Sequence, residues 1–411
     1  MINFKRTQLA NGLTVLVHED ATTPMAVMNI LYDVGARDEQ ADKTGFAHLF
    51  EHLMFGGSVN IPSYDEPLQR VGGENNAFTS NDITNYYIQL PANNLETAFW
   101  LESDRMLSLA FSEQSLDVQR NVVCEEFKQR YLSQPYGDVW LKLRPLAYTT
   151  HPYQWATIGK ELSHIEQATL ADVKAFFFKH YRPCNAIMVV AGAVNYEEVV
   201  QLAEKWFGPI PMGEKYVRNL PVEPQQTAAR EQKVTADVPL DAIYKAYHVG
   251  DRKDKGYYAA DLLTDILSRG YSARLYQRLL KDQQLFSDVN AYMTGDMDAG
   301  LIIVEGKLSK GVSMEQAEKA IDAELERMKT ELVNDTELQK VKNKIESTMV
   351  FAEMNLLNKA MNLAYFELLG DANAANTELE KYLAVDAAEL QAMAQKIFVK
   401  ENCSTLYYHA N

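Results

Sequence analysis

The sequence contains little cysteine and no long apolar run. Its three cysteines, Cys124, Cys184 and Cys403, are odd in number and far apart in a chain of 411 residues. This spacing excludes a zinc finger or a disulfide framework and favours a reducing compartment. No run of eighteen apolar residues is present, which excludes a typical transmembrane helix. The first residues, 1–6, lack the apolar core of a signal peptide, so we expect no secretory leader.

Positive charge is also scarce relative to negative charge. Lysine and arginine total 40 against 56 aspartates and glutamates, which gives a net charge of −16. That balance argues against a nucleic-acid partner; it permits basic substrates but does not establish them. Hydrophobic residues make up 47% and charged residues 23%, as in a soluble globular protein whose length allows two domains.

Residues 45–57 carry a His-x-x-Glu-His pattern on an apolar stretch without proline. The apolar residues recur at helical spacing and two glycines close the stretch, so we predict a helix. His48 and His52 would lie one turn apart, with Glu51 on the same side. Two neutral imidazoles at this spacing chelate zinc, and a neighbouring carboxylate can accept a proton from water. A histidine pair on a helix is more often structural, but three such groups on an apolar helix are costly to bury without a role.

A catalytic zinc site needs a third protein ligand and an open position for water. A second predicted helix, residues 115–131, offers Glu125 and Glu126. Its apolar middle would turn one of these carboxylates inward. Acidic residues on helices are mostly solvated, however, so the residues alone leave this ligand open. Cys124 is interpreted as a packing residue rather than a nucleophile.

Strands and helices alternate along the whole chain. A long loop containing Pro135, Pro145 and Pro152 is predicted between residues 131 and 170. The predicted strands are residues 13–17, 25–34, 84–90, 186–191 and 404–408, and the further predicted helices are residues 95–109, 170–180 and 196–206.

Short internal matches recur at nearly one offset, close to half the chain length. Residues 171–175 match residues 388–392, an offset of 388 − 171 = 217, and the same offset pairs Asn185 with Asn402. Residues 34–35 match residues 249–250, an offset of 249 − 34 = 215.

When the second alignment is extended with a shift of one residue, residues 48–52 align with residues 262–266. The latter do not contain the His-x-x-Glu-His pattern. Duplication is therefore the better interpretation. We predict an α+β fold of two homologous domains, each a mostly antiparallel sheet with helices packed on one face. The boundaries are 1–212 for a metal-bearing domain, 213–232 for a polar linker, and 233–411 for a domain without the metal motif.

Four motifs together carry a family resemblance: His48-x-x-Glu51-His52, Gly72-Gly73-Glu74-Asn75-Asn76-Ala77-Phe78-Thr79-Ser80, Thr84-Asn85-Tyr86-Tyr87, and Arg120-x-Val122-Val123-x-Glu125-Glu126. With them, essentially the whole chain resembles the inverzincin, or pitrilysin-type, metallopeptidases, which include insulin-degrading enzyme and the mitochondrial processing peptidases. The resemblance implies one Zn²⁺ per chain held by His48, His52 and Glu126, with Glu51 as general base. It also implies that Asn76, Ala77 and Phe78 bind an extended peptide by β-augmentation.

The chain departs from the family pattern at two places. Gln119 replaces a glutamate that supports the metal ligands, a change that would weaken metal binding or slow turnover without abolishing it. The Arg and Tyr that single-chain members carry in their C-terminal half are replaced by Leu280 and Ser287. Arg274, Tyr276 and Arg278 lie nearby but out of register.

An intact metal motif without the Arg/Tyr pair resembles the zinc-bearing subunit of two-subunit bacterial enzymes and the beta subunit of mitochondrial processing peptidase. We therefore expect a heterodimer with a homologous chain that lacks zinc and supplies the pair; a homodimer is the alternative.

The resemblance implies a zinc-dependent endopeptidase that hydrolyses unfolded peptides as the catalytic half of a two-chain chamber. Two alternatives stay open: a non-catalytic scaffold or core subunit of the same fold, and a dedicated precursor-processing protease. A scaffold would not need four polar residues kept together. We expect a cytoplasmic location in a bacterial cell, and neither a membrane nor a nucleic-acid partner.

Overall fold

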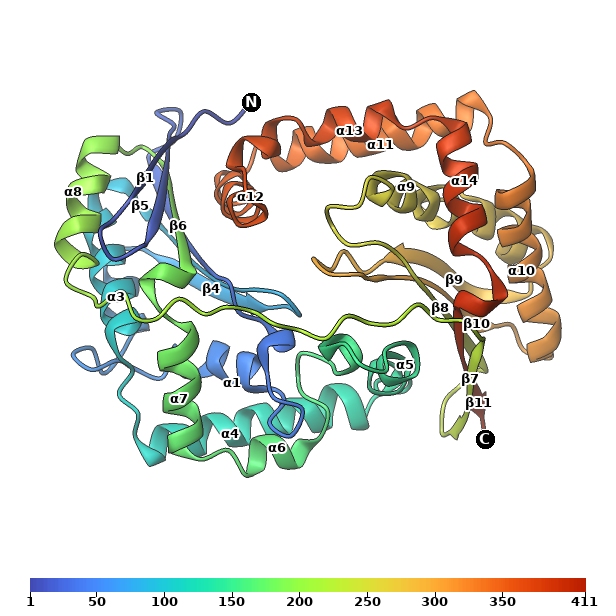
Figure 1. The fold of residues 1–411 in the computed structure, drawn as a ribbon, viewed down its shortest axis with the longest axis horizontal. Helices are drawn as coiled ribbons and strands as arrows, with labels where there is room; N and C mark the ends of the chain where they lie inside the picture. The colour runs from blue at the N-terminus through green and yellow to red at the C-terminus, as the bar shows by residue number, and fades with distance from the viewer. The chain divides into compact units, whose positions relative to one another are not determined.

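The computed structural model describes all 411 residues, which fold into two compact units. The first unit comprises Met1–Gln129, Trp155–Leu220 and Val350–Thr377, and the second comprises Arg130–Gln154, Pro221–Met349 and Glu378–Asn411. Each unit has its own sheet and helices (Figure 1). No helix combines the length and apolar character needed to cross a bilayer.

The first unit is built on a six-stranded sheet with the order β1-β2-β6-β3-β5-β4. Only the β2–β6 pair is parallel; all other neighbours are antiparallel. The predicted strands in this half are confirmed to within a few residues. The bounds are β1 Lys5–Gln8, β2 Thr14–Glu19, β3 Met25–Tyr32, β4 Glu74–Thr79, β5 Thr84–Pro91 and β6 Ala186–Gly192.

The second unit repeats this topology in a five-stranded sheet with the order β7-β11-β8-β10-β9. The β7–β11 pair is parallel and the other pairs are antiparallel, so each strand has a counterpart in the series β2-β6-β3-β5-β4. The predicted α+β fold of two similar, mostly antiparallel sheets is therefore confirmed. The bounds are β7 Arg230–Ala236, β8 Ala242–His248, β9 Phe286–Met293, β10 Leu301–Leu308 and β11 Cys403–Ala410.

A repeated asparagine contact supports the duplication at the level of single atoms. The Nδ2 of Asn185 donates to the carbonyl oxygens of Asp33 (3.1 Å) and His180 (2.9 Å). It thereby ties the end of a helix to the end of β3. Asn402, the residue that the 217-residue offset pairs with it, donates in the same way to the carbonyl oxygens of His248 and Ile397, each at 3.0 Å.

Helices cover both faces of the first sheet, which corrects the prediction that helices pack on one face only. In Figure 1, α3 and α8 lie on one side of the sheet and α12 on the other. α12 comes from the C-terminal half of the chain and contacts β2, β3 and β6. The helices of this unit are α1 Phe46–Leu53, α2 Asp65–Arg70, α3 Leu95–Leu107, α4 Glu113–Phe127, α6 Leu162–Glu166, α7 Leu170–His180, α8 Tyr196–Trp206 and α12 Leu356–Leu369.

The second sheet has the same two-sided arrangement. One face packs against helices of the C-terminal half, and the other against α5, from the N-terminal half. The helices of this unit are α5 Val139–Ala147, α9 Tyr257–Ser268, α10 Met314–Thr330, α11 Asp335–Ala352, whose last turn passes into the first unit, α13 Glu378–Ala384 and α14 Ala387–Ile397.

The prediction of a long loop after residue 131 is wrong, because α5 lies inside it and includes Pro145. Val139, Leu143 and Ala147 recur at helical spacing and bury one stripe of α5 against the second sheet. Pro145 lies in the last turn, where only one backbone hydrogen bond is lost. The packing therefore overrides the local signal of the proline.

α5 and α12, which each cover the second face of a sheet, occupy equivalent positions in the repeat. α5 begins at residue 139 and α12 at residue 356, and 356 − 139 = 217. Each half of the sequence therefore contributes one helix to the sheet built by the other half. These exchanged segments are where the units differ from the predicted boundaries of 1–212, 213–232 and 233–411. As a division of the sequence, those boundaries stay a prediction.

Candidate metal centre and peptide-binding edge

Helix α1 is fixed at its start by a buried carboxylate rather than by its own N-cap side chain. Gly45 adopts a φ of 87° before the helix. The two carboxylate oxygens of Glu39 accept the backbone N–H groups of Gly45 (2.9 Å) and Ala47 (2.8 Å). Burial raises the pKa of Glu39 to about 8, although these donors oppose the rise. The apolar face of the helix stacks on α7 through Phe50 and Phe176, whose ring centres lie 5.2 Å apart.

Three predicted ligands come together where α1 contacts α4. The Oε2 of Glu126 lies 3.8 Å from the Nε2 of His48 and 3.5 Å from the Nε2 of His52. One ligand atom from each of these residues lies within 4.8 Å of the others, and no other three His, Cys, Asp or Glu residues of the chain form such a group. Their side chains are 13%, 23% and 18% exposed in the order His48, His52, Glu126, so water can reach the site.

The geometry separates the two glutamates that the sequence left as alternatives. Glu125 is exposed and forms a surface ion pair with Lys128 at 2.8 Å. Glu126, one residue or about 100° further around α4, faces the histidines. Cys124 packs into the interior, and burial raises its pKa, which disfavours the thiolate. Gln119 lies half-buried on the same helix, two turns before Glu126.

The donor set fits a zinc ion. Zinc takes imidazole nitrogen and carboxylate oxygen at about 2.0–2.2 Å, so two ligands of a tetrahedral site lie about 3.3–3.5 Å apart. The observed separations of 3.5 and 3.8 Å between the carboxylate and the imidazoles approach this spacing. Three protein ligands would leave a fourth position open, as in catalytic rather than structural sites.

Glu51 has a partner on the neighbouring strand. The hydroxyl of Thr79, at the end of β4, donates to the Oε2 of Glu51 at 2.7 Å. No sequence pattern predicts this contact, because the two residues are 28 positions apart. It links the predicted general base to the strand that holds the predicted peptide-binding residues.

Strand β4 is the free edge of the first sheet, because it pairs only with β5. Ser80 N–H donates to the carbonyl oxygen of Ile83 at 2.9 Å, which sets the alternation of the ladder. From there Phe78 and Asn76 face β5, and the backbone groups of Ala77 face the open edge. Consistent with this, the Ala77 N–H is accepted by the Asn76 side chain at 2.8 Å. The three predicted peptide-binding residues therefore lie on an edge that can accept another strand.

A fully buried ion pair in α3 packs against Tyr86, which in turn contacts α1. This ion pair was not predicted from the sequence. Glu102 and Arg105 are each 1% exposed and form two hydrogen bonds of 2.8 and 2.6 Å. The guanidinium lies 4.4 Å from the ring centre of Tyr86, whose hydroxyl donates to the Phe50 carbonyl. An Arg and a Glu three residues apart usually form a surface pair, so only the fold reveals their burial.

The residues near the positions of the missing Arg/Tyr pair, Leu280 and Ser287, already make contacts within the second unit. Arg274 makes two hydrogen bonds to Glu337 at 2.9 and 2.8 Å. Arg278 bonds to Glu324 at 2.7 Å. Ser287 is exposed at the start of β9, and its hydroxyl donates to a backbone carbonyl. Neither arginine is therefore free to replace the missing one without breaking an ion pair.

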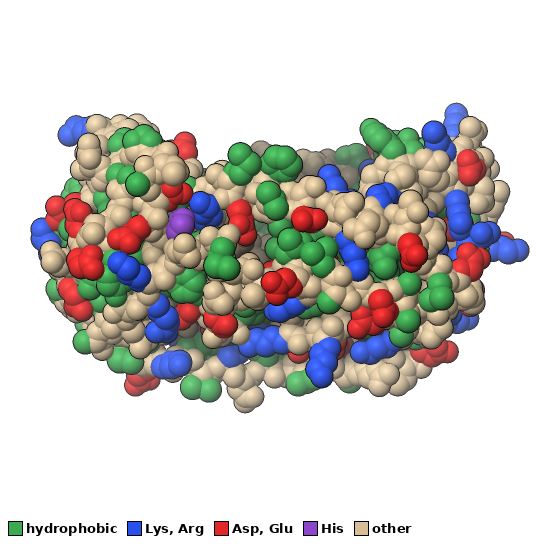
Figure 2. All heavy atoms as spheres, turned by 90° about the horizontal axis from the view of Figure 1, so that it is seen from above, with side chains coloured by type: hydrophobic (Ala, Val, Ile, Leu, Met, Phe, Trp, Pro, Cys, Tyr) green, Lys and Arg blue, Asp and Glu red, His purple; other side chains and the backbone are tan.

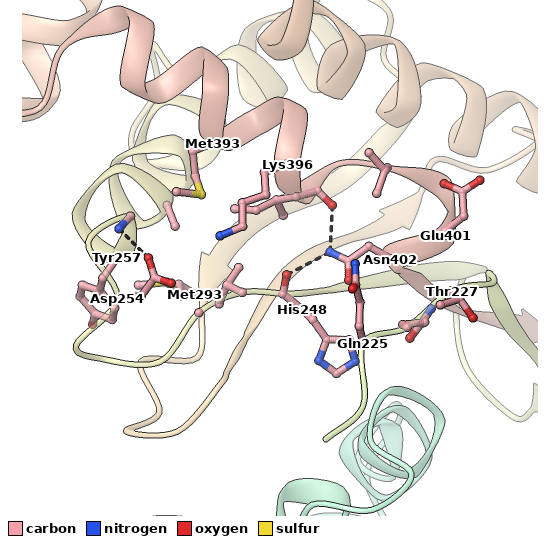
Figure 3. A pocket seen from close by; sticks show the side chains of 17 residues that line it. Gln225, Thr227, His248, Asp254, Tyr257, Met293, Met393, Lys396, Glu401 and Asn402 are labelled. Atoms are coloured by element: carbon pink, nitrogen blue, oxygen red, sulfur yellow. Dashed lines mark hydrogen bonds between the residues drawn. The ribbon is translucent and has the colours of Figure 1, made fainter. Parts of the chain in front are cut away.

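The second unit also contains a cavity of about 700 Å³ between α9, α14 and the end of β8. Figure 3 shows His248 and Asn402 at its wall, joined by the hydrogen bond from Asn402 to the His248 carbonyl. Met293 and Met393 supply apolar lining, and Asp254 lies at the opposite side. The cavity holds no group of three metal-ligating side chains, and the group formed by His48, His52 and Glu126 lies in the first unit.

Two family profiles match most of the chain, one in each half. The profile of Insulinase (Peptidase family M16) matches residues 14–150, and that of the Peptidase M16 inactive domain matches residues 167–345. Zinc protease PqqE of Helicobacter pylori is 30% identical over 405 residues, covering 97% of this chain and 91% of that protein. The chain therefore belongs to peptidase family M16, the pitrilysin-type family.

Solved structures agree on the fold. The crystal structure of a protease from Helicobacter pylori matches with a TM-score of 0.94 and 29% identity, covering 99% of this chain and all of that one. The periplasmic protease PqqL from Escherichia coli matches with a TM-score of 0.81 and 19% identity, where all of this chain covers 48% of that chain. At that identity the second match speaks only for the fold.

Proposed function

We propose that this protein is a zinc-dependent endopeptidase that hydrolyses unfolded peptides. The observation that carries the proposal is the grouping of His48, His52 and Glu126, with Glu51 on the same helix as the two histidines. The zinc proteases among its relatives support the choice of metal.

In this proposal each side chain has one task. His48 and His52, as neutral imidazoles, and Glu126, as a carboxylate, hold one Zn²⁺ per chain. When bound, the ion supplies Lewis acidity toward the scissile carbonyl and lowers the pKa of the attacking water toward ~7. Glu51 accepts the proton of that water and returns it to the leaving amine nitrogen. No covalent intermediate with the chain is required.

The open edge of β4 is the proposed place for the substrate backbone. A peptide that adds as a further strand gains main-chain hydrogen bonds that depend little on its sequence. Asn76, Ala77 and Phe78 would contact it, and Phe78 is 39% exposed with its ring available to a substrate side chain. This mode favours extended, unfolded segments over folded proteins.

The first test compares the wild-type chain with Glu51→Gln. We expect one zinc per chain in both proteins, by metal analysis, and at least a hundredfold loss of peptide hydrolysis in the variant, since proton transfer contributes about 10²–10⁴-fold. His52→Ala should lose both the zinc and the activity. Equal turnover by wild type and Glu51→Gln would refute the proposed mechanism.

We also propose that the enzyme works with a second, homologous chain that lacks zinc and supplies the Arg/Tyr pair. Leu280 and Ser287 at the matching positions support this, as does the engagement of Arg274 and Arg278 in ion pairs. The chain also spans 48% of the longer PqqL polypeptide, whose fold it shares. A homodimer is the alternative form of the two-chain chamber.

The partner can be sought by purifying the tagged chain from its native cell and identifying copurifying proteins. A homologous chain of similar size, required for turnover, is the expected result. Full activity of a purified homodimer would refute the heterodimer. Zinc binding without turnover, even with every copurified chain present, would instead favour the scaffold role, and cleavage confined to precursor sequences would favour a processing protease.

The charge pattern supports a peptide rather than a nucleic acid as the ligand. On the face drawn in Figure 2, basic and acidic side chains are interspersed, and the net charge is −16. A cytoplasmic location in a bacterial cell stays our proposal. Its support is the small number of cysteines, all of them free. Fractionation of the native cell tests it, and recovery outside the cytoplasm would refute it.

A further inference from the structure

Thr79 stands at the meeting point of two parts of the proposed site. Its hydroxyl donates to the Glu51 carboxylate at 2.7 Å, while its backbone belongs to β4, the free edge of the sheet. A side chain that touches the base and a backbone that can touch a peptide thus belong to one residue.

The backbone of Thr79 points away from β5. Thr79 pairs with Thr84, next to the hydrogen-bonded pair of Ser80 and Ile83. In an antiparallel ladder the bonded and non-bonded pairs alternate, so the Thr79–Thr84 pair is non-bonded. The N–H and C=O of Thr79, like those of Ala77, are therefore directed to the open edge, where an added strand would bond them.

We propose that Thr79 is a positioning residue that couples peptide pairing along β4 to the orientation of Glu51. A peptide strand bonded to the Thr79 backbone restricts this residue, and the restriction passes through one hydroxyl to the carboxylate that moves the proton. The inference rests on the proposed peptidase function and deepens it: the base is held best when the substrate is long enough to pair along the edge.

The consequence is a specific kinetic pattern. Binding energy from a part of the substrate remote from the scissile bond would raise kcat and not only lower KM. A hydrogen bond to a charged group is worth roughly a ten- to hundredfold change in rate. A residue that only stabilised the strand would not make kcat depend on peptide length.

The experiment uses the chain, with its partner if one is needed for turnover, and two fluorogenic peptides. One peptide is short, and the other is extended by six residues, the length of β4. For wild type, the extension should raise kcat. For Thr79→Val, which keeps the shape and removes the hydroxyl, the extension should lower KM as before, but kcat should stay roughly ten- to hundredfold lower. Thr79→Ser should restore the gain.

A matched control is Thr84→Val, on the paired strand. The Thr84 hydroxyl donates to the Val34 carbonyl and not to Glu51, so this variant should keep the length dependence of kcat. A second readout is independent of turnover: in Glu51→Gln, hydrogen exchange at the Thr79 and Ala77 amides should slow when the extended peptide binds. Zinc content should be unchanged in all three threonine variants.

The outcomes separate this inference from the proposed function. Cleavage by wild type with the same gain in kcat for Thr79→Val would overturn the coupling and leave the peptidase intact. Unprotected Thr79 amides in the peptide complex would overturn it as well. Absence of cleavage by zinc-loaded wild type, alone and with its partner, would overturn the proposed function and the coupling together.

Discussion

The stability of the first unit should fall in mild acid because of one buried histidine. His180, at the end of α7, is fully buried, and neither of its ring nitrogens has a hydrogen-bond partner. Its ring packs against those of Phe176 and Tyr216, with ring centres 4.6 and 4.7 Å away. Burial above all, then the charges of Lys179 and Arg218, lowers its pKa from 6.5 to about 3; Asp33 opposes the shift.

The direction in which the free energy of unfolding changes with pH follows from proton binding at His180. Between pH 6.5 and about 3 the unfolded chain binds a proton at this histidine and the folded chain does not. The free energy of unfolding therefore rises with pH in this window, by about 1.4 kcal/mol per pH unit, and the full contribution is present above pH 6.5. At pH 5, 1.5 units below 6.5, this group alone removes about 2 kcal/mol relative to pH 7.

The test compares wild type with His180→Leu in urea unfolding at pH 5, 6 and 7, with EDTA present to remove metal. Tryptophan fluorescence reports the transition, because three of the four tryptophans, Trp100, Trp155 and Trp206, lie in the first unit. We expect the variant to lose about 2 kcal/mol less than wild type between pH 7 and pH 5. Phe176→Leu is the control: it alters the same packing but keeps the imidazole, so its pH dependence should match wild type. Parallel pH dependence in His180→Leu and wild type would refute the argument.

Three further results are expected. Glu102→Gln should destabilise the first unit by about 3–5 kcal/mol in urea unfolding, because it leaves the Arg105 guanidinium buried without its counter-charge; a loss below 1 kcal/mol would contradict this. His52→Ala should abolish the rise in melting temperature that excess zinc gives the wild type, measured by calorimetry, and an equal rise would exclude His52 as a ligand. The fragment 1–212 should be insoluble or expose apolar surface to a fluorescent dye, because it lacks α12, whereas supplying residues 350–377 should restore a folded unit; a soluble, cooperative fragment would show that α12 is dispensable.

The local features of the site could be read from the sequence. A His-x-x-Glu-His pattern needs only one helical turn to place its side chains together, so spacing and apolar periodicity were sufficient to predict α1. The same reasoning found that the second half keeps the helix and loses the ligands: α9 holds Leu262 to Ile266 at the aligned positions, all buried.

The choice between Glu125 and Glu126 needed either a family resemblance or the fold. One residue turns a side chain by about 100°, and which of the two faces α1 depends on how α4 rotates against its neighbour. The sequence of α4 does not contain that angle. The Thr79–Glu51 bond is of the same kind, because it depends on where β4 passes α1.

The topology, too, could be predicted from the sequence only in part. Repeats at offsets of 215 and 217 predicted two homologous halves, and alternating apolar residues predicted most strands, because both signals lie in short segments. The exchange of α5 and α12 left no such signal. An amphipathic helix specifies that one stripe must be buried, but it does not specify which of two similar sheets will cover it; only the tertiary structure decided that, through the chain path that brings each helix to the other half's sheet.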